Sequence, residues 1–198
     1  MKIVLLGYMA SGKSSIGRRL SEKMNIPLLD LDDYISEKEN LSVSEIFQQK
    51  GEVYFRKIEH EYVKEVLNTN TNFILALGGG TPCYGDNMKF INSTDAMSIY
   101  LEGSTKNMID RLIRKKTKRP LVASLSDEQI PEFVAKHLFE RRHFYEQAKT
   151  IIKIDNKKKK DVAEEIYKLI KLNKQQLHFF LKTQPAHVLL LMLIKKSL

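Results

Sequence analysis

The sequence predicts an α/β domain built on a five-stranded, mostly parallel sheet that is flanked by helices. Short apolar runs without polar alternation recur along its 198 residues, as expected for strands that are buried on both faces of a parallel sheet. Segments with helical periodicity separate these runs. A chain of this length makes one domain, and its core can be stable without disulfides or a structural metal.

Five apolar runs are predicted as strands. The first follows the initial Met-Lys, and the shortest contains a proline at its start. In chain order the predicted strands are residues 3–6, 27–29, 73–77, 97–101 and 151–154. Because each lies between helical segments, the connections are of the strand–helix–strand kind that gives parallel pairing.

The first helix is predicted at residues 13–24, because Ile16, Leu20 and Met24 recur every four residues and share one face. Such a face packs on a sheet. Four more helices are predicted from similar patterns, at residues 52–68, 105–115, 127–146 and 158–172.

Two capping-box patterns mark helix starts. Ser42 followed by Glu45 predicts a short helix, and Gly51 is a plausible end for it. Ser126 followed by Gln129 is a second candidate.

The net charge of +9 is concentrated near the end of the chain, where residues 153–198 hold 11 lysines and 4 acidic residues. Its centre is the lysine run at residues 157–160. A polyanion-binding surface needs a basic face across the fold, so we interpret the run as a solvated turn and helix start, and expect no nucleic-acid partner.

Several features favour a cytoplasmic protein without a membrane span. No apolar run reaches the ~18 residues that a membrane helix needs. The apolar stretch after Lys2 ends at Gly7 and is too short for a signal peptide. The single cysteine, Cys83, cannot form an internal disulfide.

The strand–helix pattern ends near residue 172. We therefore expect residues 1–172 to form the domain and residues 173–198 to be a C-terminal extension. A helix packed on the domain, a poorly ordered tail, a membrane-surface anchor and a tail from a shifted reading frame all fit its composition. Within the domain, residues 112–126 have no clear period over most of their length and are predicted to form a mobile lid.

Residues 7–14, GYMASGKS, match the phosphate-loop pattern G-x-x-x-x-G-K-S/T at every fixed position. The loop follows a predicted buried strand and opens a predicted helix, so its backbone N–H groups and the helix N-terminus can face phosphate oxygens. Lys13 is expected to reach the β- and γ-phosphates, and Ser14 to bind Mg²⁺. The residues expected to hold the nucleotide phosphates are Gly7, Ala10, Ser11, Gly12, Lys13, Ser14 and Ser15.

A GTPase is excluded, because neither Asn-Lys pair of the chain continues as the guanine-reading Asn-Lys-x-Asp. The loop therefore predicts nucleotide binding and leaves the phosphate acceptor open.

Acidic residues follow the second predicted strand. In a doubly wound sheet, ligands lie at the carboxyl ends of strands, so Asp30 and Asp32 are expected near the phosphate loop. One carboxylate can hold Mg²⁺ and the other can take a proton from an attacking hydroxyl. A helix N-cap explains Asp32 or Asp33 almost as well.

Three glycines and three arginines complete the candidate site. Gly78, Gly79 and Gly80 follow the third predicted strand, where glycines allow a close approach of backbone to ligand. Guanidinium groups bind carboxylates and phosphates, and the arginines whose positions are informative are Arg56, Arg119 and Arg141.

Taken together, these segments resemble the bacterial shikimate kinases, a family with the nucleoside-monophosphate-kinase-like fold. The resemblance covers residues 1–172 and rests on GYMASGKS, LLDLDDYI, EIF with GE..FR..E, LALGGGT, KRPL and ERR.FY, in that order. It implies an ATP-dependent phosphotransferase that phosphorylates the 3-hydroxyl of shikimate in aromatic amino acid biosynthesis.

The resemblance also implies roles for individual residues. Lys13 and Ser14 would bind ATP and Mg²⁺, and Asp30 would support Mg²⁺ through its coordination shell. Arg111 would lie against the adenine, and Arg119 on the lid would stabilise the transferring phosphate. On the acceptor side, Asp32 would contact the reacting hydroxyl as a base, Arg56 and Arg141 would clamp the shikimate carboxylate, and Gly78, Gly79 and Gly80 would line the acceptor, the last two facing its hydroxyls. Shikimate and ATP would be the partners of a monomer.

The sequence departs from the family at His143, where a proline is usual, which leaves Arg141 and Arg142 as alternatives. We favour Arg141 because it lies four residues before Tyr145. Two other functions remain open: a related small-molecule kinase such as gluconate kinase, and a non-enzymatic nucleotide-binding protein that uses its basic tail as a partner site.

Overall fold

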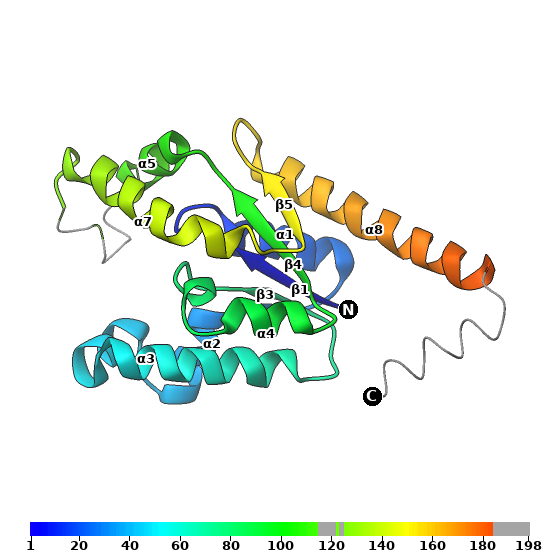
Figure 1. The fold of residues 1–198 in the computed structure, drawn as a ribbon, viewed down its shortest axis with the longest axis horizontal. Coiled ribbons are helices and arrows are strands. Elements are labelled where there is room, and N and C mark those ends of the chain that lie inside the picture. Colours follow the sequence, from blue (N-terminus) through cyan, green and yellow to red (C-terminus); the bar gives the residue numbers. More distant parts are fainter. Residues whose placement is uncertain (115–121, 123–124, 184–198) are drawn as a thin grey trace. The chain divides into compact units, whose positions relative to one another are not determined.

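A computed structural model describes residues 1–114, 122 and 125–183 of the chain, and Figure 1 shows the path of the chain. Its strands are β1 (Lys2–Leu6), β2 (Leu28–Asp30), β3 (Phe73–Ala76), β4 (Met97–Glu102) and β5 (Thr150–Lys153). Its helices are α1 (Lys13–Met24), α2 (Leu31–Glu39), α3 (Val43–Leu67), η1 (Thr81–Cys83), α4 (Asn87–Ser93), α5 (Thr105–Ile113), α7 (Gln129–Tyr145) and α8 (Lys159–Thr183).

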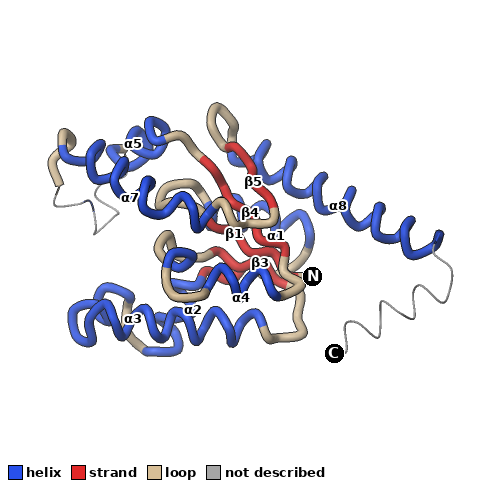
Figure 2. Tube along the Cα trace, viewed as in Figure 1, coloured by secondary structure: helices blue, strands red, loops and turns tan. Residues whose placement is uncertain are grey.

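The five strands form one sheet in the order β2-β3-β1-β4-β5, and every pair in it is parallel. This confirms the predicted five-stranded α/β architecture. Strand residues supply much of the core: residues 3–6 of β1 and all of β3 are buried. Figure 2 shows the strands lying between helices.

The order of the strands places β1 at the centre of the sheet. The chain passes to one side of β1 for β2 and β3 and then crosses to the other side for β4 and β5. Such a switch in direction opens a crevice at the carboxyl ends of the strands. The phosphate loop, which follows β1, therefore lies between the segments after β2 and β3 on one side and those after β4 and β5 on the other.

Two loops on the β4–β5 side are joined by a carboxylate. Asp155, just after β5, accepts hydrogen bonds from the backbone N–H of Ser104 at 2.9 Å and from the side-chain amide of Asn107. Ser104 is also the N-cap of α5. The start of α5 is thus held beside the β5–α8 turn.

The predicted helix starts have mixed outcomes. Ser42 and Glu45 form the full capping box at the start of α3. Gly51 interrupts the helical backbone where the short helix was predicted to end: it has φ 81° and ψ 171°, and α3 consists of two helical segments joined by a kink at this residue. Ser126 is not the N-cap of α7, which is Glu128. Of the second box, only the bond from the Ser126 backbone N–H to the Gln129 side-chain oxygen forms, at 2.8 Å.

Three helices, α2, η1 and α4, were not predicted. The first begins directly after β2, and its N-cap is Asp30, whose side chain accepts from the backbone N–H of Asp32. The expectation that Asp32 or Asp33 caps this helix is therefore wrong, because both lie within its first turn. Short helices that follow a strand without a linker leave too little apolar periodicity to detect.

The helix predicted at residues 158–172 continues further, because α8 ends at Thr183. The chain divides into two compact units, Met1–Ala163 and Glu164–Leu198. Within the second unit, the Lys171 ammonium lies 5.1 Å from the Tyr167 ring centre. Most of the predicted lid, residues 112–126, lies outside the described residues. Among the helices that are described, none is long and apolar enough to cross a membrane.

Candidate active site

The phosphate loop is held by backbone geometry that glycine makes possible. Gly7 has φ 142° and Gly12, the N-cap of α1, has φ 101°. Ala10 takes φ 65°, an unfavourable left-handed conformation for a residue with a Cβ. The Lys13 ammonium donates to the Gly7 carbonyl at 2.7 Å and to the Tyr8 carbonyl at 3.2 Å, so it lies across its own loop.

Oxygen ligands for a cation meet at the start of α1. The Ser14 hydroxyl donates to the Asp30 carboxylate at 2.6 Å. Hydroxyl and carboxylate oxygens are the protein ligands that suit Mg²⁺, which usually keeps waters and binds substrate phosphates as well. The structure thus brings together the two residues predicted to serve the metal, and their chemistry fits that ion.

Asp32 lies in an environment that disfavours its negative charge. It lies in the first turn of α2, where it lines the concave cavity shared with Lys13. Desolvation by the surrounding protein, followed by the negative charges of Asp30 and Glu59, raises the pKa of Asp32 to about 6, while Lys13 opposes the shift. A carboxylate with a pKa near neutrality is a better proton acceptor than an ordinary aspartate.

Arg56 is positioned by a buried carboxylate. Its guanidinium donates to Glu59 at 2.9 Å and pairs with Glu52 at 3.3 Å. Glu59 is only 1% exposed, and it also accepts from the Thr81 hydroxyl at 2.5 Å. This network holds Arg56 against the glycine segment that follows β3.

The three glycines are required by close contacts rather than by positive φ angles. A Cβ on Gly80 would lie 2.8 Å from the Arg56 guanidinium, and one on Gly78 would lie 3.0 Å from the Asp32 carboxylate. A Cβ on Gly79 would come within 3.3 Å of the Met9 backbone nitrogen. The segment therefore packs between the phosphate loop and the acidic and basic groups of the site.

The neighbouring arginines of α7 have different surroundings. Arg142 is exposed and forms ion pairs with Glu102 at 2.9 Å and Glu146 at 3.0 Å. The charge of Arg141 instead acts on Tyr8 and Cys83: burial raises the pKa of Tyr8 to about 12 and that of Cys83 to about 11, and Arg141 opposes both shifts. This contrast favours Arg141 as the residue that faces the site.

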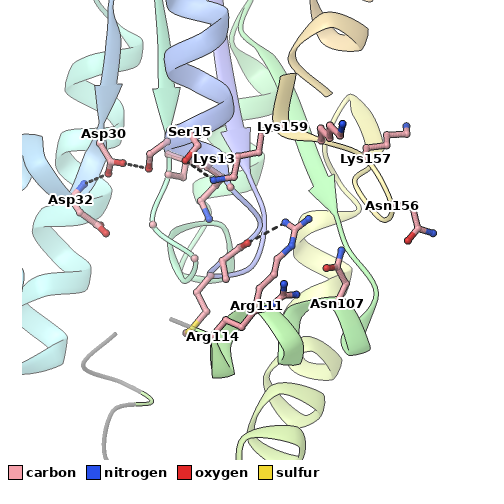
Figure 3. Close-up of a pocket in the computed structure, with 18 residues that line it drawn as sticks. Lys13, Ser15, Asp30, Asp32, Asn107, Arg111, Arg114, Asn156, Lys157 and Lys159 are labelled. Atoms are coloured by element: carbon pink, nitrogen blue, oxygen red, sulfur yellow. Dashed lines mark hydrogen bonds between the residues drawn. The ribbon is translucent and has the colours of Figure 1, made fainter. Parts of the chain in front are cut away.

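The nucleotide side of the site lies beyond the phosphate loop. The Arg111 guanidinium donates to the carbonyls of Ala10 and Ser11 at 3.4 and 3.3 Å. A cavity of about 680 Å³ extends over this loop. In Figure 3, Asp30 and Asp32 lie at one side of the lining residues, Asn156 and Lys157 at the other, and Arg111 and Arg114 below the loop. Arg119, predicted to act on the transferring phosphate, lies outside the described residues.

Sequence reasoning missed three groups in this region. Glu59 lies three residues after Arg56 on the same helix, and that i, i+3 spacing was the available signal. The Tyr145 hydroxyl donates to the Gly79 carbonyl at 2.5 Å. Lysines 157, 158 and 159 line the cavity, so the interpretation of this run as a solvated turn was incomplete.

The fold and the phosphate loop define a class: a phosphate-loop kinase fold built on a parallel sheet. The family profile described as shikimate kinase matches residues 9–171. The chain is 52% identical over 169 residues to the shikimate kinase of Flavobacterium psychrophilum, covering 85% of this chain and 98% of the relative. The chain belongs to the shikimate kinase family.

Solved structures agree with this assignment. A shikimate kinase from Bacteroides thetaiotaomicron superposes with a TM-score of 0.79 at 32% identity, covering 86% of this chain and 98% of that chain. A shikimate kinase from Acinetobacter baumannii, determined in complex with shikimate, has a TM-score of 0.76 at 31% identity, covering 87% of this chain and 94% of that chain.

Proposed function

We propose that this chain transfers the γ-phosphoryl group of ATP to the 3-hydroxyl of shikimate, with Asp32 between the two substrates. As a member of the shikimate kinase family it is an ATP-dependent kinase that phosphorylates a hydroxyl group. The observation that supports the detailed assignment is the placement of Asp32. It shares a cavity with Lys13 of the phosphate loop, and its carboxylate lies beside Gly78, two residues before the glycine covered by Arg56.

The acceptor is bound as an anion. Arg56 and Arg141 supply guanidinium groups for the shikimate carboxylate, because such groups pair with carboxylates in a bidentate manner. Gly78 lines the acceptor, the backbone of Gly79 and Gly80 faces the ring hydroxyls, and Glu59 fixes the orientation of Arg56.

Transfer then needs one proton acceptor and stabilisation of charge. Asp32 takes the proton of the attacking hydroxyl, the hydroxyl oxygen bonds to the γ-phosphorus, and the bond from that phosphorus to the bridging oxygen breaks to release ADP. Lys13 exchanges its hydrogen bonds with Gly7 and Tyr8 for phosphate oxygens. Arg119 would add a second positive charge when the lid closes.

The phosphate loop and its neighbours would hold the nucleotide and the metal. The backbone of Gly7, Ala10, Ser11 and Gly12, together with Ser15, would cradle the phosphates, and Arg111 would lie against the adenine. Ser14 and Asp30 would hold Mg²⁺, whose chemistry is to neutralise charge on the β- and γ-phosphates. We further propose that the enzyme acts as a monomer, since all of these groups come from one chain, and that it is cytoplasmic, which its single cysteine favours.

The test is ADP release by the purified chain with ATP and Mg²⁺, measured with shikimate and with gluconate as acceptors. We expect turnover with shikimate and none with gluconate, because the chain belongs to the shikimate kinase family. The carboxylate that both acceptors carry does not distinguish them. Phosphorylation of gluconate alone would contradict the proposal. Nucleotide binding without turnover on either acceptor would favour a binding protein.

A further inference from the structure

The lysine run at residues 157–160 is placed where it weakens the helix that it begins. Helix α8 starts at Lys159, and positive side chains at a helix N-terminus oppose the helix dipole. Lys157, Lys158 and Lys159 nevertheless line the same cavity as the phosphate loop. Positive side chains that disfavour a helix start, and that lie beside a functional site, point to a role of these lysines in function.

Lys159 contacts the phosphate loop itself. Its ammonium donates to the Ser15 hydroxyl at 3.0 Å, and its Cε lies 3.8 Å from the position that a Cβ on Gly12 would occupy. The side chain therefore covers the loop at Gly12 and places its charge at the first turn of α1. Lys160, the next residue, is exposed and is not among the described residues that line the cavity.

The contacts of Ser14 and Ser15, in the first turn of α1, indicate which part of a nucleotide Lys159 would contact. Ser14 is bonded to Asp30 at the end of β2, on the acceptor side, whereas Ser15 is bonded to Lys159 at the start of α8, which follows β5. In Figure 3, Asp30 and Asp32 lie at one end of the group, and Lys159 lies between Lys13 and the labelled residues that follow β5.

The order of the strands in the sheet indicates the same orientation for the nucleotide. The γ-phosphate must lie near the acceptor, on the β2–β3 side of β1, so the α-phosphate and nucleoside extend toward β4 and β5. Backbone N–H groups of a phosphate loop bind the α- and β-phosphates, and its lysine reaches the β- and γ-phosphates. A cation beside Ser15 is thus placed for the α-phosphate.

The charge of the cavity fits a polyanion. Two carboxylates line it, those of Asp30 and Asp32, against six cationic side chains, which are Lys13, Arg111, Arg114, Lys157, Lys158 and Lys159. A lysine ammonium is a compact charge that binds phosphate well. Phosphate bound there would offset the repulsion among these cations.

We propose that Lys159 is a second lysine of the nucleotide site, which binds the α-phosphate of ATP and ADP beside Ser15. The inference rests on the proposed use of ATP. Lys13 acts on the phosphate that is transferred, whereas Lys159 acts on the part that stays with the nucleoside, so it contributes to binding of both ATP and ADP.

The test compares binding of ADP, AMP and shikimate by calorimetry to the wild-type chain and to Lys159→Met, Lys159→Arg and Lys160→Met. Lys159→Met should weaken ADP and AMP binding about tenfold, the size of a lost charge-assisted hydrogen bond. Shikimate binding should not change. Lys159→Arg keeps the charge and should bind both nucleotides within about twofold of wild type, as should Lys160→Met, the exposed neighbour.

Added salt should weaken ADP binding less in Lys159→Met than in wild type, because one screened charge is gone. The unfolding temperature of Lys159→Met without nucleotide should not fall, since the change removes a cation from a helix N-terminus. Unchanged ADP binding in Lys159→Met, equal losses in Lys159→Met and Lys160→Met, or a lower unfolding temperature would overturn the inference. If the wild-type chain binds no ADP, the proposed function fails with it.

Discussion

Asp32 is expected to lower the stability of the folded protein at neutral pH, where its carboxylate is ionised and can accept a proton. Its folded-state pKa of about 6 lies above the ordinary value of 3.8, so the folded protein binds this proton more tightly than the unfolded chain does. The stabilisation that protonated Asp32 provides is complete below about pH 4 and is lost as the pH rises through about 6. At pH 7 the ionised carboxylate is therefore a local source of instability.

Asp32→Asn should thus be more stable than wild type at pH 7.5, by about 1 kcal/mol, which is less than the full pKa shift implies because solvent screens the charges. At pH 5 the difference should be smaller. Urea unfolding at the two pH values measures both, and an equal gain at each pH would show that charge is not the cause. Turnover should be lost while ADP binding is kept.

The pKa of Asp32 also predicts the pH dependence of the reaction. If Asp32 accepts the hydroxyl proton, the free enzyme must hold it ionised, so kcat/KM for shikimate should fall about tenfold for each pH unit below about 6. An initial-rate profile from pH 5 to pH 8 with saturating ATP tests this. A flat profile down to pH 5 would show that a different group accepts the proton or that chemistry is not limiting.

The two arginines of α7 offer a matched comparison at the residue scale. Arg141→Ala should raise the KM for shikimate about 10- to 100-fold, as expected when a charged group loses its partner, with the KM for ATP little changed. Arg142→Ala removes exposed ion pairs to Glu102 and Glu146 and should cost less than about 1 kcal/mol of stability, with both KM values unchanged. The reverse pattern would assign the substrate contact to Arg142.

At the scale of elements, what could be predicted depended on the length of the pattern. Helix α1 occupies residues 13–24 as predicted, and two of its three regularly spaced apolar residues, Ile16 and Leu20, lie on its buried face. Helix α2 was missed because it follows β2 with no intervening residue and has only Leu31 and Ile35 buried. Gly51 was predicted to end one helix before the next, and its non-helical φ and ψ divide α3 into two segments at that residue.

The same contrast applies to the site. The phosphate loop and the acidic pair could be predicted because each is contiguous in sequence and follows a strand. The roles of Glu59, Tyr145 and Lys159 could not, since they depend on contacts between distant segments: Thr81 to Glu59, Gly79 to Tyr145, and Ser15 to Lys159. Local patterns show which groups lie at strand ends, whereas the sheet order decides which of them meet.

The capping box at α3 gives a prediction for that element. Ser42 accepts from the Glu45 backbone N–H, and the Glu45 carboxylate accepts from the Ser42 backbone N–H at 2.7 Å. Ser42→Ala should cost about 1 kcal/mol of stability. The kinetic constants for shikimate should not change, because Gly51 and its kink lie between this cap and Arg56. Chemical unfolding and initial rates measure the two effects, and a raised KM for shikimate would show that the cap also positions Arg56.

For the whole molecule, the division between the domain and the C-terminal residues remains our proposal: residues 1–172 as the catalytic domain and 173–198 as an extension. The site groups described above all precede residue 164, and α8 continues without a break to Thr183. The proposed end of the domain therefore lies inside α8 rather than at the end of a helix. How far the chain can be shortened depends on how much of α8 the catalytic domain needs.

Two truncations answer it. A chain ending at residue 183 keeps the whole of α8, and one ending at residue 172 keeps only its first half. We expect both to phosphorylate shikimate within about twofold of the full chain, since no site residue is removed, and the shorter one to unfold at a lower temperature because an exposed helix end frays. Loss of turnover in the 172-residue chain alone would make the second half of α8 part of the catalytic fold. Loss in both would assign that role to residues 184–198.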